Sequence, residues 1–230
     1  MNTVIASATR SSTPDECDNL PIVRSIKECL RGEPAFELYS NNTLGLPQLY
    51  NEILTKYKKS SDVKWLVLTH DDVYIDDARM VVKLNQVHEQ HGFNIVGLAG
   101  CISPSIKQYN LWHLMAAREH LRGHVAHPAS PNGAIQVSAF GPTPSRVTLI
   151  DGLFFALHIP TIRDSKWQFN ENYKFHHYDI ASCIDANKHR LKIGVAPINV
   201  IHSSPGLLSV KDQMWSESNQ MFLKEYGSSI

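Results

Sequence analysis

Short apolar runs alternate with segments of helical periodicity through the first hundred residues. Residues 46–57 carry an apolar side chain every three or four positions, with Pro47 in the first turn, which predicts an amphipathic helix. Residues 63–68 form a continuous apolar run of the kind found in buried parallel strands. The alternation implies βαβ units, and hence an α/β fold with a mainly parallel central sheet flanked by helices. We predict strands at 4–8, 36–39, 63–68 and 95–99, helices at 20–30, 46–57 and 76–90, and a polar loop over 11–18.

The pattern changes beyond residue 100. Residues 123–145 are rich in Pro, Gly, Ser and Ala, which predicts either an extended, flexible active-site flap or a loosely packed hairpin. The sequence has no internal repeat and no low-complexity linker, so one domain over residues 1–230 is the simplest organisation. The remaining periodicity predicts strands at 147–158 and 193–201 and helices at 178–191 and 210–226.

Charge and composition narrow the class of function. Lys plus Arg and Asp plus Glu number 22 each, so the formal net charge is zero. That balance argues against a nucleic-acid binder that relies on counterion release, and it provides no polybasic membrane anchor. No stretch reaches the ~18 apolar residues of a membrane span, and the N-terminal segment lacks the features of a secretory signal. The 4 cysteines are scattered without a CxxC pair, so we expect reduced thiols and a cytoplasmic protein.

Three polar residues, His70, Asp71 and Asp72, follow a predicted buried strand. In open parallel sheets ligands bind outside the carboxyl ends of the strands, so these carboxylates lie where a ligand would be. One of them can bind a divalent cation while the other holds a hydroxyl group, and aspartate oxygens suit Mg²⁺ or Mn²⁺. A solvated turn or a helix N-cap accounts for the same residues without any function, because Asp is favoured at caps.

Asp179 opens the predicted helix at 178–191. The helix dipole favours its ionised form there, so it can act as a general base, although a helix cap explains the same placement. His176 and His177 precede it, but adjacent side chains point apart and rarely share one ion. We therefore expect surface or supporting roles for these two histidines.

Two further positions follow predicted strands. His202 ends the last strand before a turn rich in Gly and Pro, where it is either a metal ligand or merely structural. Asp151 and Gly152 form either a tight turn or an acceptor contact, with the glycine permitting close approach. The sequence contains no Walker A, GxGxxG, GxSxG or HExxH pattern, which disfavours P-loop NTPases, Rossmann dehydrogenases and α/β-hydrolases.

Taken in order, these motifs resemble those of nucleotide-sugar glycosyltransferases of the GT-A fold, in the broad family-2-like group. The resemblance spans about residues 3–206. His70 stands where the family's DxD motif commonly has its first Asp, which gives a His-x-Asp variant, and Tyr178 stands where the family often has Glu. The matching segments are Ala6–Arg10 after the first strand, Asn42–Asn51 with the pattern N-x-x-G-x-x-x-x-x-N, His70–Asp72, Asp151–Gly152, Tyr178–Asp179 and His202.

The resemblance also implies roles. Asp72 and His202 would hold Mn²⁺ or Mg²⁺, and Asp179 would be the base in a direct displacement with inversion. Residues 1–100 would bind a nucleotide-diphosphate sugar donor, and residues 101–230 would bind a glycan or other hydroxyl acceptor, with the flexible loop 123–145 closing over the donor. The implied donor-binding residues are Ala8, Thr9, Arg10, Asn42, Gly45, Asn51 and Asp71, and the implied acceptor-binding residues are Asp151, Gly152 and His177.

Two other classes of function remain open. A sugar-phosphate nucleotidyltransferase has a related architecture, but its glycine-rich loop after the first strand is missing, because residues 8–14 contain no glycine. A non-catalytic GT-A-like module that binds a nucleotide or a glycan would share all the motifs without turnover. The release of products from a nucleotide-sugar donor distinguishes the three classes.

Overall fold

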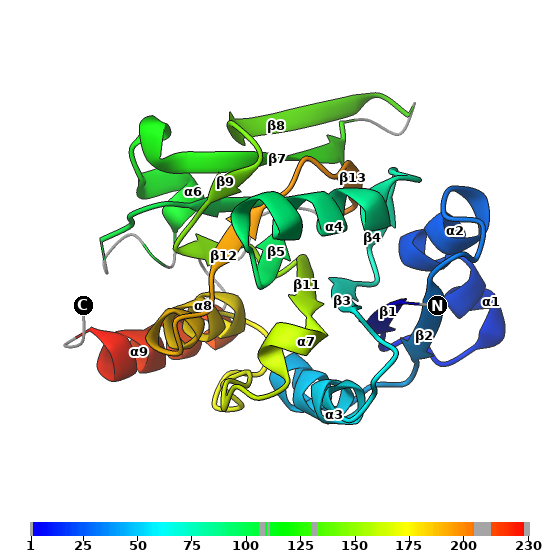
Figure 1. The fold of residues 1–230 in the computed structure, drawn as a ribbon, viewed down its shortest axis with the longest axis horizontal. Helices are drawn as coiled ribbons and strands as arrows, with labels where there is room; N and C mark the ends of the chain where they lie inside the picture. The colour runs from blue at the N-terminus through cyan, green and yellow to red at the C-terminus, as the bar shows by residue number, and fades with distance from the viewer. Residues whose placement is uncertain (1, 106–108, 110, 130–132, 205–212, 228–230) are drawn as a thin grey trace.

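The first apolar run forms the buried strand β1 (Thr3–Ala8), which lies between β2 (Ala35–Tyr39) and β3 (Trp65–His70) and is parallel to both. This computed structural model describes residues 2–105, 109, 111–129, 133–204 and 213–227. The central sheet has seven strands in the order β2-β1-β3-β11-β5-β12-β9. β11 and β9 run against the other five, so the predicted mainly parallel sheet is confirmed (Figure 1). The remaining strands of this sheet are β5 (Ile95–Gly97), β9 (Ser145–Arg146), β11 (Phe154–His158) and β12 (Ile193–Val195).

A second sheet of six strands has the order β10-β6-β7-β13-β4, with β8 paired to β7. The chain passes from the central sheet to this second sheet several times. Several segments predicted as one strand each form two short strands, one in each sheet. The apolar run at 95–99 divides at Leu98, and the run at 147–158 divides at Asp151–Gly152. The strands of the second sheet are β4 (Val73–Ile75), β6 (Ala99–Cys101), β7 (Leu121–Pro128), β8 (Ile135–Gly141), β10 (Leu149–Ile150) and β13 (Val200–His202).

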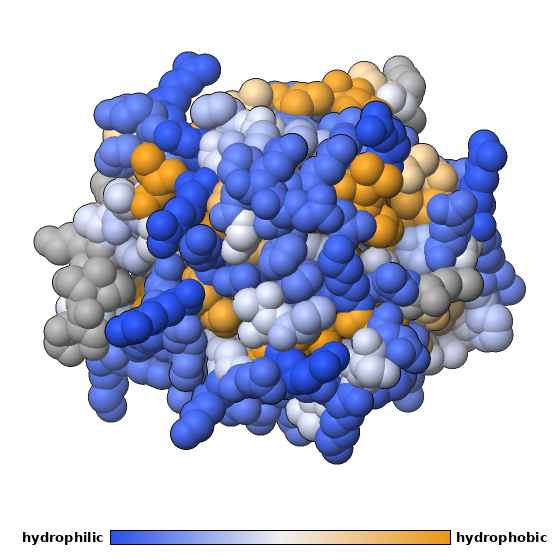
Figure 2. All heavy atoms as spheres, viewed as in Figure 1, coloured by the Kyte–Doolittle hydropathy of each residue, from blue (hydrophilic) through white to orange (hydrophobic). Residues whose placement is uncertain are grey.

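The predicted flexible loop at 123–145 is a β-hairpin for most of its length. β7 pairs with β8 on one side and with β6 and β13 on the other, so the segment is built into the second sheet. The segment is therefore a hairpin, one of the two alternatives predicted from the sequence, and not an extended flap; residues 130–132 lie outside the described residues. β8 forms an outer strand, and Figure 2 shows apolar side chains along this edge, where Ile135 and Val137 are 52% and 59% exposed.

Helices cover the sheets where the apolar periodicity predicts them. The predicted helix at 46–57 is α3, whose buried face includes Leu49, Tyr50 and Ile53. A short helix replaces the end of the loop expected at 11–18, because Thr13 and Glu16 form a reciprocal capping box. Within the described residues, none of the helices has both the length and the apolar character needed to span a membrane. The helices are α1 (Pro14–Asp18), α2 (Pro21–Glu28), α3 (Leu46–Lys58), α4 (Met80–His91), α6 (Trp112–Met115), the 3₁₀ turn η1 (Arg118–His120), α7 (Ile159–Ile162), α8 (Tyr178–Lys188) and α9 (Gln213–Tyr226).

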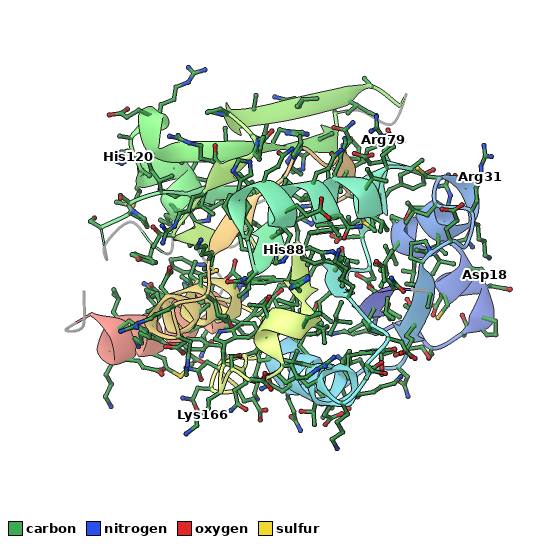
Figure 3. The ribbon with its side chains drawn as sticks, in the orientation of Figure 1. Asp18, Arg31, Arg79, His88, His120 and Lys166 are labelled. Atoms are coloured by element: carbon green, nitrogen blue, oxygen red, sulfur yellow. The ribbon has the colours of Figure 1, made fainter. Side chains whose placement is uncertain are left out.

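One hydrophobic core joins the elements, with buried members from Val4 in β1 to Tyr226 in α9. Charged side chains such as Asp18, Arg31 and Lys166 lie on the periphery (Figure 3). The mixed α/β fold is therefore continuous from the first strand to the last helix.

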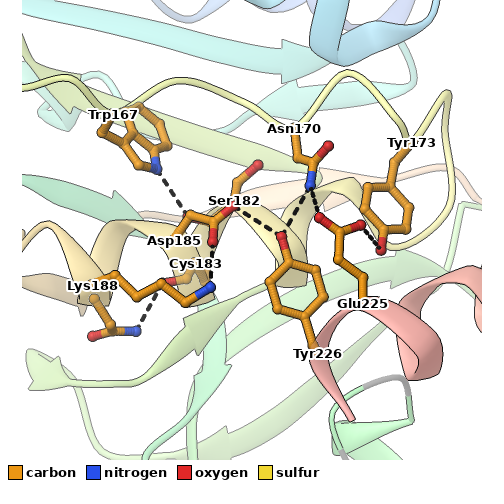
Figure 4. Close-up of polar contacts among 10 residues, drawn as sticks. Trp167, Asn170, Tyr173, Ser182, Cys183, Asp185, Lys188, Glu225 and Tyr226 are labelled. Atoms are coloured by element: carbon orange, nitrogen blue, oxygen red, sulfur yellow. Dashed lines mark hydrogen bonds and ion pairs between the residues drawn. The ribbon is translucent and has the colours of Figure 1, made fainter. Parts of the chain in front are cut away.

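A polar network attaches the C-terminal helix α9 to α8 (Figure 4). The Tyr226 hydroxyl donates to Asp185 in α8 at 2.9 Å, and the Asn170 amide donates to Glu225 in α9 at 2.8 Å. The Trp167 indole donates to the Ser182 carbonyl at 3.0 Å, which fixes the loop before α8. These bonds hold α8 in place, and α8 carries Asp179 at its start.

Candidate active site

Two strand ends from different sheets bring three potential metal ligands together. β3 of the central sheet ends at His70, and β13 of the second sheet ends at His202. The turn after β3 carries Asp72, and the pairing of β13 with β4 sets His202 opposite Val73. One ligand atom each from His70, Asp72 and His202 lies within 4.8 Å of the others, and His202 Nε2 lies 3.3 Å from Asp72 Oδ1.

The charges of this triad depend on one another. Burial opposes ionisation of Asp72, but the contact with His202 outweighs it and keeps the pKa of that carboxyl below its usual value. Burial likewise opposes protonation of His202, and the contact with Asp72 outweighs it and raises the pKa of the ring. Burial lowers the pKa of His70, so this ring is neutral at physiological pH. The triad is thus a carboxylate beside two imidazoles.

A pocket of about 190 Å³ lies beside the triad and contains the predicted base. His70, Asp151, Gly152 and Asp179 all line it, together with the aromatic side chains of Tyr109, Trp112, Phe175, Tyr178 and Trp215. Three separate motifs therefore meet at one pocket. They are His70 at the end of β3, the Asp151–Gly152 pair, and the start of α8.

Asp179 does not cap α8. The cap position is His177, which has a left-handed φ of 63°, and Asp179 lies in the first turn. The explanation of Asp179 as a helix cap is therefore wrong. Its Oδ2 instead accepts a hydrogen bond of 3.0 Å from the Gly152 N–H. Burial, together with the charge of Asp151, raises the pKa of Asp179 to about 7.

Gly152 is required where the chain passes between the sheets. A Cβ atom at this position would lie 2.7 Å from the Tyr178 hydroxyl and 3.1 Å from the Asp179 Cβ. Asp151 shapes the same turn, because its Oδ1 accepts a hydrogen bond of 3.1 Å from the Leu153 N–H. The tight turn expected from the sequence is therefore present, and the contact of Asp151 and Gly152 with an acceptor stays a prediction.

Sequence reasoning missed the role of Tyr178. Its side chain is 2% exposed, and its hydroxyl donates to the Gly152 carbonyl at 2.7 Å. The same hydroxyl lies 3.1 Å from His70 Nε2. The only sequence signal was that tyrosine replaces the glutamate often found at this position in the family that the chain resembles.

Several predicted donor-binding residues lie at the same edge of the central sheet. Ala8 ends β1 and is paired with His70 in the register of β1 and β3. Thr9 follows and is buried, with its N–H bonded to the Tyr39 carbonyl at 3.0 Å. Arg10 is exposed, and Asp71 precedes Asp72 in the turn after β3. This group is near the triad, as the topology of parallel strands requires.

The predicted donor residues of the Asn42–Asn51 segment make contacts within the chain. The Asn42 amide bonds to the backbone of Leu44, and Gly45 packs against Lys174.

Asn51 is 8% exposed, and its amide donates to the Phe169 carbonyl at 2.9 Å and to Glu171 at 2.8 Å. Both of its N–H groups are thus bonded within the fold, and its part in donor binding stays a prediction.

His177 lines the pocket, but most of its surface is covered by α9. It is 6% exposed, and its Nδ1 lies 2.8 Å from the Ser218 hydroxyl. Its ring packs against Trp215 and Phe222 with centroid separations of 5.3 and 5.8 Å. Burial, together with His176, lowers the pKa of His177 to about 4, so its ring is neutral at physiological pH.

Two solved crystal structures have folds similar to that of this chain. The crystal structure of A197 from STIV matches with a TM-score of 0.55 at 11% identity, over 89% of this chain and 86% of that chain. The crystal structure of S. aureus TarS matches with a TM-score of 0.51 at 12% identity, over all of this chain and 40% of that chain. The fold is of the GT-A type that the sequence predicts. A search of curated protein sequences found no match.

The sequence pattern of the glycosyltransferase-like family matches residues 42–226, which is most of the chain. The chain belongs to this family, and it is a transferase.

Proposed function

We propose that this protein is a metal-dependent glycosyltransferase that moves a sugar from a nucleotide-diphosphate donor to an acceptor hydroxyl with inversion. His70, Asp72 and His202 hold the metal, and Asp179 is the base. The observation that carries the proposal is that His70, a member of this triad, and Asp179 line the same pocket. Membership of the glycosyltransferase-like family supports it independently.

The triad fits a divalent cation. Asp72 Oδ1 is buried without a hydrogen-bond partner among the described residues, although it faces His202 at 3.3 Å, so a cation would complete its surroundings. Two imidazole nitrogens and one carboxylate favour Mn²⁺ over Mg²⁺, which prefers oxygen ligands and its own waters. A cation bound there would neutralise the charge that develops on the diphosphate leaving group.

Asp179 takes the proton of the attacking hydroxyl. A pKa of about 7 leaves much of the carboxyl ionised at neutral pH while keeping it basic enough to accept a proton. The Gly152 N–H binds Oδ2 and orients the carboxylate. An inverting displacement needs only this one base, in contrast to the two carboxylates of a glycoside hydrolase.

Aromatic side chains line the pocket. Trp112 is 4% exposed, whereas Phe175 is 51% exposed and stacks on His70 with centroids 5.8 Å apart. We assign the acceptor to the side formed by Asp151, Gly152 and these rings, and the donor to the side formed by Ala8, Thr9 and Asp71.

Nucleotide binding in the presence and absence of Mn²⁺ tests this proposal. Thermal shift with nucleoside diphosphates should show stabilisation that depends on Mn²⁺ in the wild-type protein. Asp72→Ala should abolish that dependence and leave the fold intact, because a carboxylate in a turn contributes little to the core. Asp76→Ala is the matched control, since Asp76 is an exposed aspartate just beyond β4. Unchanged dependence on Mn²⁺ in Asp72→Ala would contradict the metal assignment.

A further inference from the structure

The Tyr178 hydroxyl lies within hydrogen-bond distance of two groups, and it can donate its single hydrogen to only one of them. It lies 2.7 Å from the Gly152 carbonyl oxygen and 3.1 Å from His70 Nε2. A carbonyl oxygen can only accept a hydrogen bond, so the single hydrogen of the hydroxyl is directed at Gly152. The hydroxyl oxygen therefore has only lone pairs to offer to His70.

The tautomer of His70 follows from that assignment. A neutral imidazole carries one N–H, and the nitrogen that faces the lone pairs of Tyr178 must carry it. His70 is thus protonated at Nε2, and its Nδ1 has a free lone pair. A metal ligand needs such an unprotonated nitrogen, and the hydrogen bond made by the other ring nitrogen decides which one it is.

We propose that Tyr178 is a positioning residue that fixes His70 as the Nε2–H tautomer and so presents Nδ1 to the cation. The inference rests on the proposed metal site. It also gives a physical reason for tyrosine at this position, because an ionised glutamate could not donate a hydrogen bond to the Gly152 carbonyl.

The Tyr178 side chain is held firmly enough for this role. It starts α8, and its ring packs edge-on against Tyr50 at a centroid distance of 6.0 Å. A Cβ atom at position 152 would lie 2.7 Å from the Tyr178 hydroxyl, so glycine at this position leaves room for the hydrogen bond from that hydroxyl to the Gly152 carbonyl.

The Gly152 residue joins the two halves of the site. Its carbonyl accepts from Tyr178, on the side of the metal triad, while its N–H donates to Asp179, the base. A shift of this one residue would alter the orientation of His70 and of Asp179 together. The position of the cation ligand and that of the base are therefore set by the same peptide segment.

Nitrogen NMR of the metal-free protein tests the tautomer directly. Long-range ¹H–¹⁵N correlations of His70 should show the Nε2–H form in the wild-type protein. Tyr178→Phe keeps the ring but removes the hydroxyl, so His70 should lose its single tautomer, and the affinity for Mn²⁺ should fall about 10–100-fold. Tyr173→Phe is the matched control, since it removes a buried tyrosine hydroxyl that donates to Glu225 and contacts neither His70 nor Tyr178. It should change neither measurement.

Three results would overturn the proposal. An Nδ1–H form in the wild-type protein contradicts it, whether or not Tyr178→Phe folds. A folded Tyr178→Phe protein with unchanged tautomer and unchanged Mn²⁺ affinity contradicts the role of Tyr178 while the metal site stands. Failure of the wild-type protein to bind Mn²⁺, with His70 in the Nε2–H form, contradicts the proposed function and, with it, the role of Tyr178 toward a cation.

Discussion

Asp179 combines a raised pKa with a fixed hydrogen bond, and one substitution separates these two properties. Asp179→Asn keeps an oxygen that can accept from the Gly152 N–H, but it cannot take a proton. Transfer to an acceptor should fall about 10²–10⁴-fold, the usual contribution of a positioned base. Initial rates of sugar transfer at saturating donor provide the measurement. Donor affinity should change little, because the base acts on the acceptor.

Asp185→Asn is the control for this prediction. Asp185 lies on the same helix but bonds to Tyr226, away from the proposed chemistry. Its substitution should leave the transfer rate close to that of the wild-type protein. Full transfer activity in a folded Asp179→Asn protein would exclude Asp179 as the base.

Single residues also show what the sequence could predict about the site. The family resemblance pairs Asp72 with His202, and the fold does bring these two side chains into contact. The contact between Tyr178 and His70 joins residues 108 apart in sequence and depends on a third group, the carbonyl of Gly152. No local pattern contains that information. Asn51 fitted the expected pattern, but its amide binds a loop that the sequence does not place beside it.

Among the elements, the β7–β8 hairpin corresponds to one of the two alternatives predicted for its segment, and Gly123 explains how it packs. Gly123 has a φ of +99°, and a Cβ there would lie 1.9 Å from the Leu98 carbonyl oxygen. Gly123→Ala should therefore destabilise the protein by about 3 kcal/mol or more, through both backbone strain and overpacking. Urea unfolding measures the change in the free energy of unfolding.

Gly133→Ala is the matched control for the hairpin. Gly133 also has a positive φ, of +80°, but no described atom lies within 4 Å of its added Cβ. The cost should be limited to backbone strain of about 1–2 kcal/mol. Equal losses in the two variants would contradict the tight packing of β7 against β6.

The sequence predicted which segments form strands and helices better than it predicted where those elements begin and end. Every predicted strand and helix has a counterpart, because burial and amphipathic periodicity are local properties of the chain. The predicted strand at 193–201 nevertheless comprises β12 and β13, which lie in different sheets. β12 is buried throughout and β13 begins with the buried Val200, so the apolar pattern is nearly continuous across the change of sheet. Packing of a whole sheet decides where such a run divides.

For the whole molecule, the raised pKa of Asp179 links stability to pH. The folded protein holds a proton on this carboxyl up to about pH 7, whereas the unfolded chain releases it near the ordinary pKa of 3.8. Raising the pH between these values therefore favours the unfolded state at this group. The free energy of unfolding of the wild-type protein should fall, relative to that of Asp179→Asn, between about pH 4 and pH 7. Urea unfolding over a pH series would show this, and parallel pH profiles would contradict the raised pKa.

Product analysis with nucleotide-sugar donors tests the central claim, that the molecule is a metal-dependent glycosyltransferase whose site is built from the ends of β3 and β13 and the start of α8. UDP-, GDP- and dTDP-sugars should each be incubated with the protein and Mn²⁺. At least one donor should release nucleoside diphosphate and free sugar in the absence of acceptor, and both removal of Mn²⁺ and Asp72→Ala should abolish the release. Formation of a nucleoside triphosphate from pyrophosphate, or binding of the donors without turnover, would contradict the account.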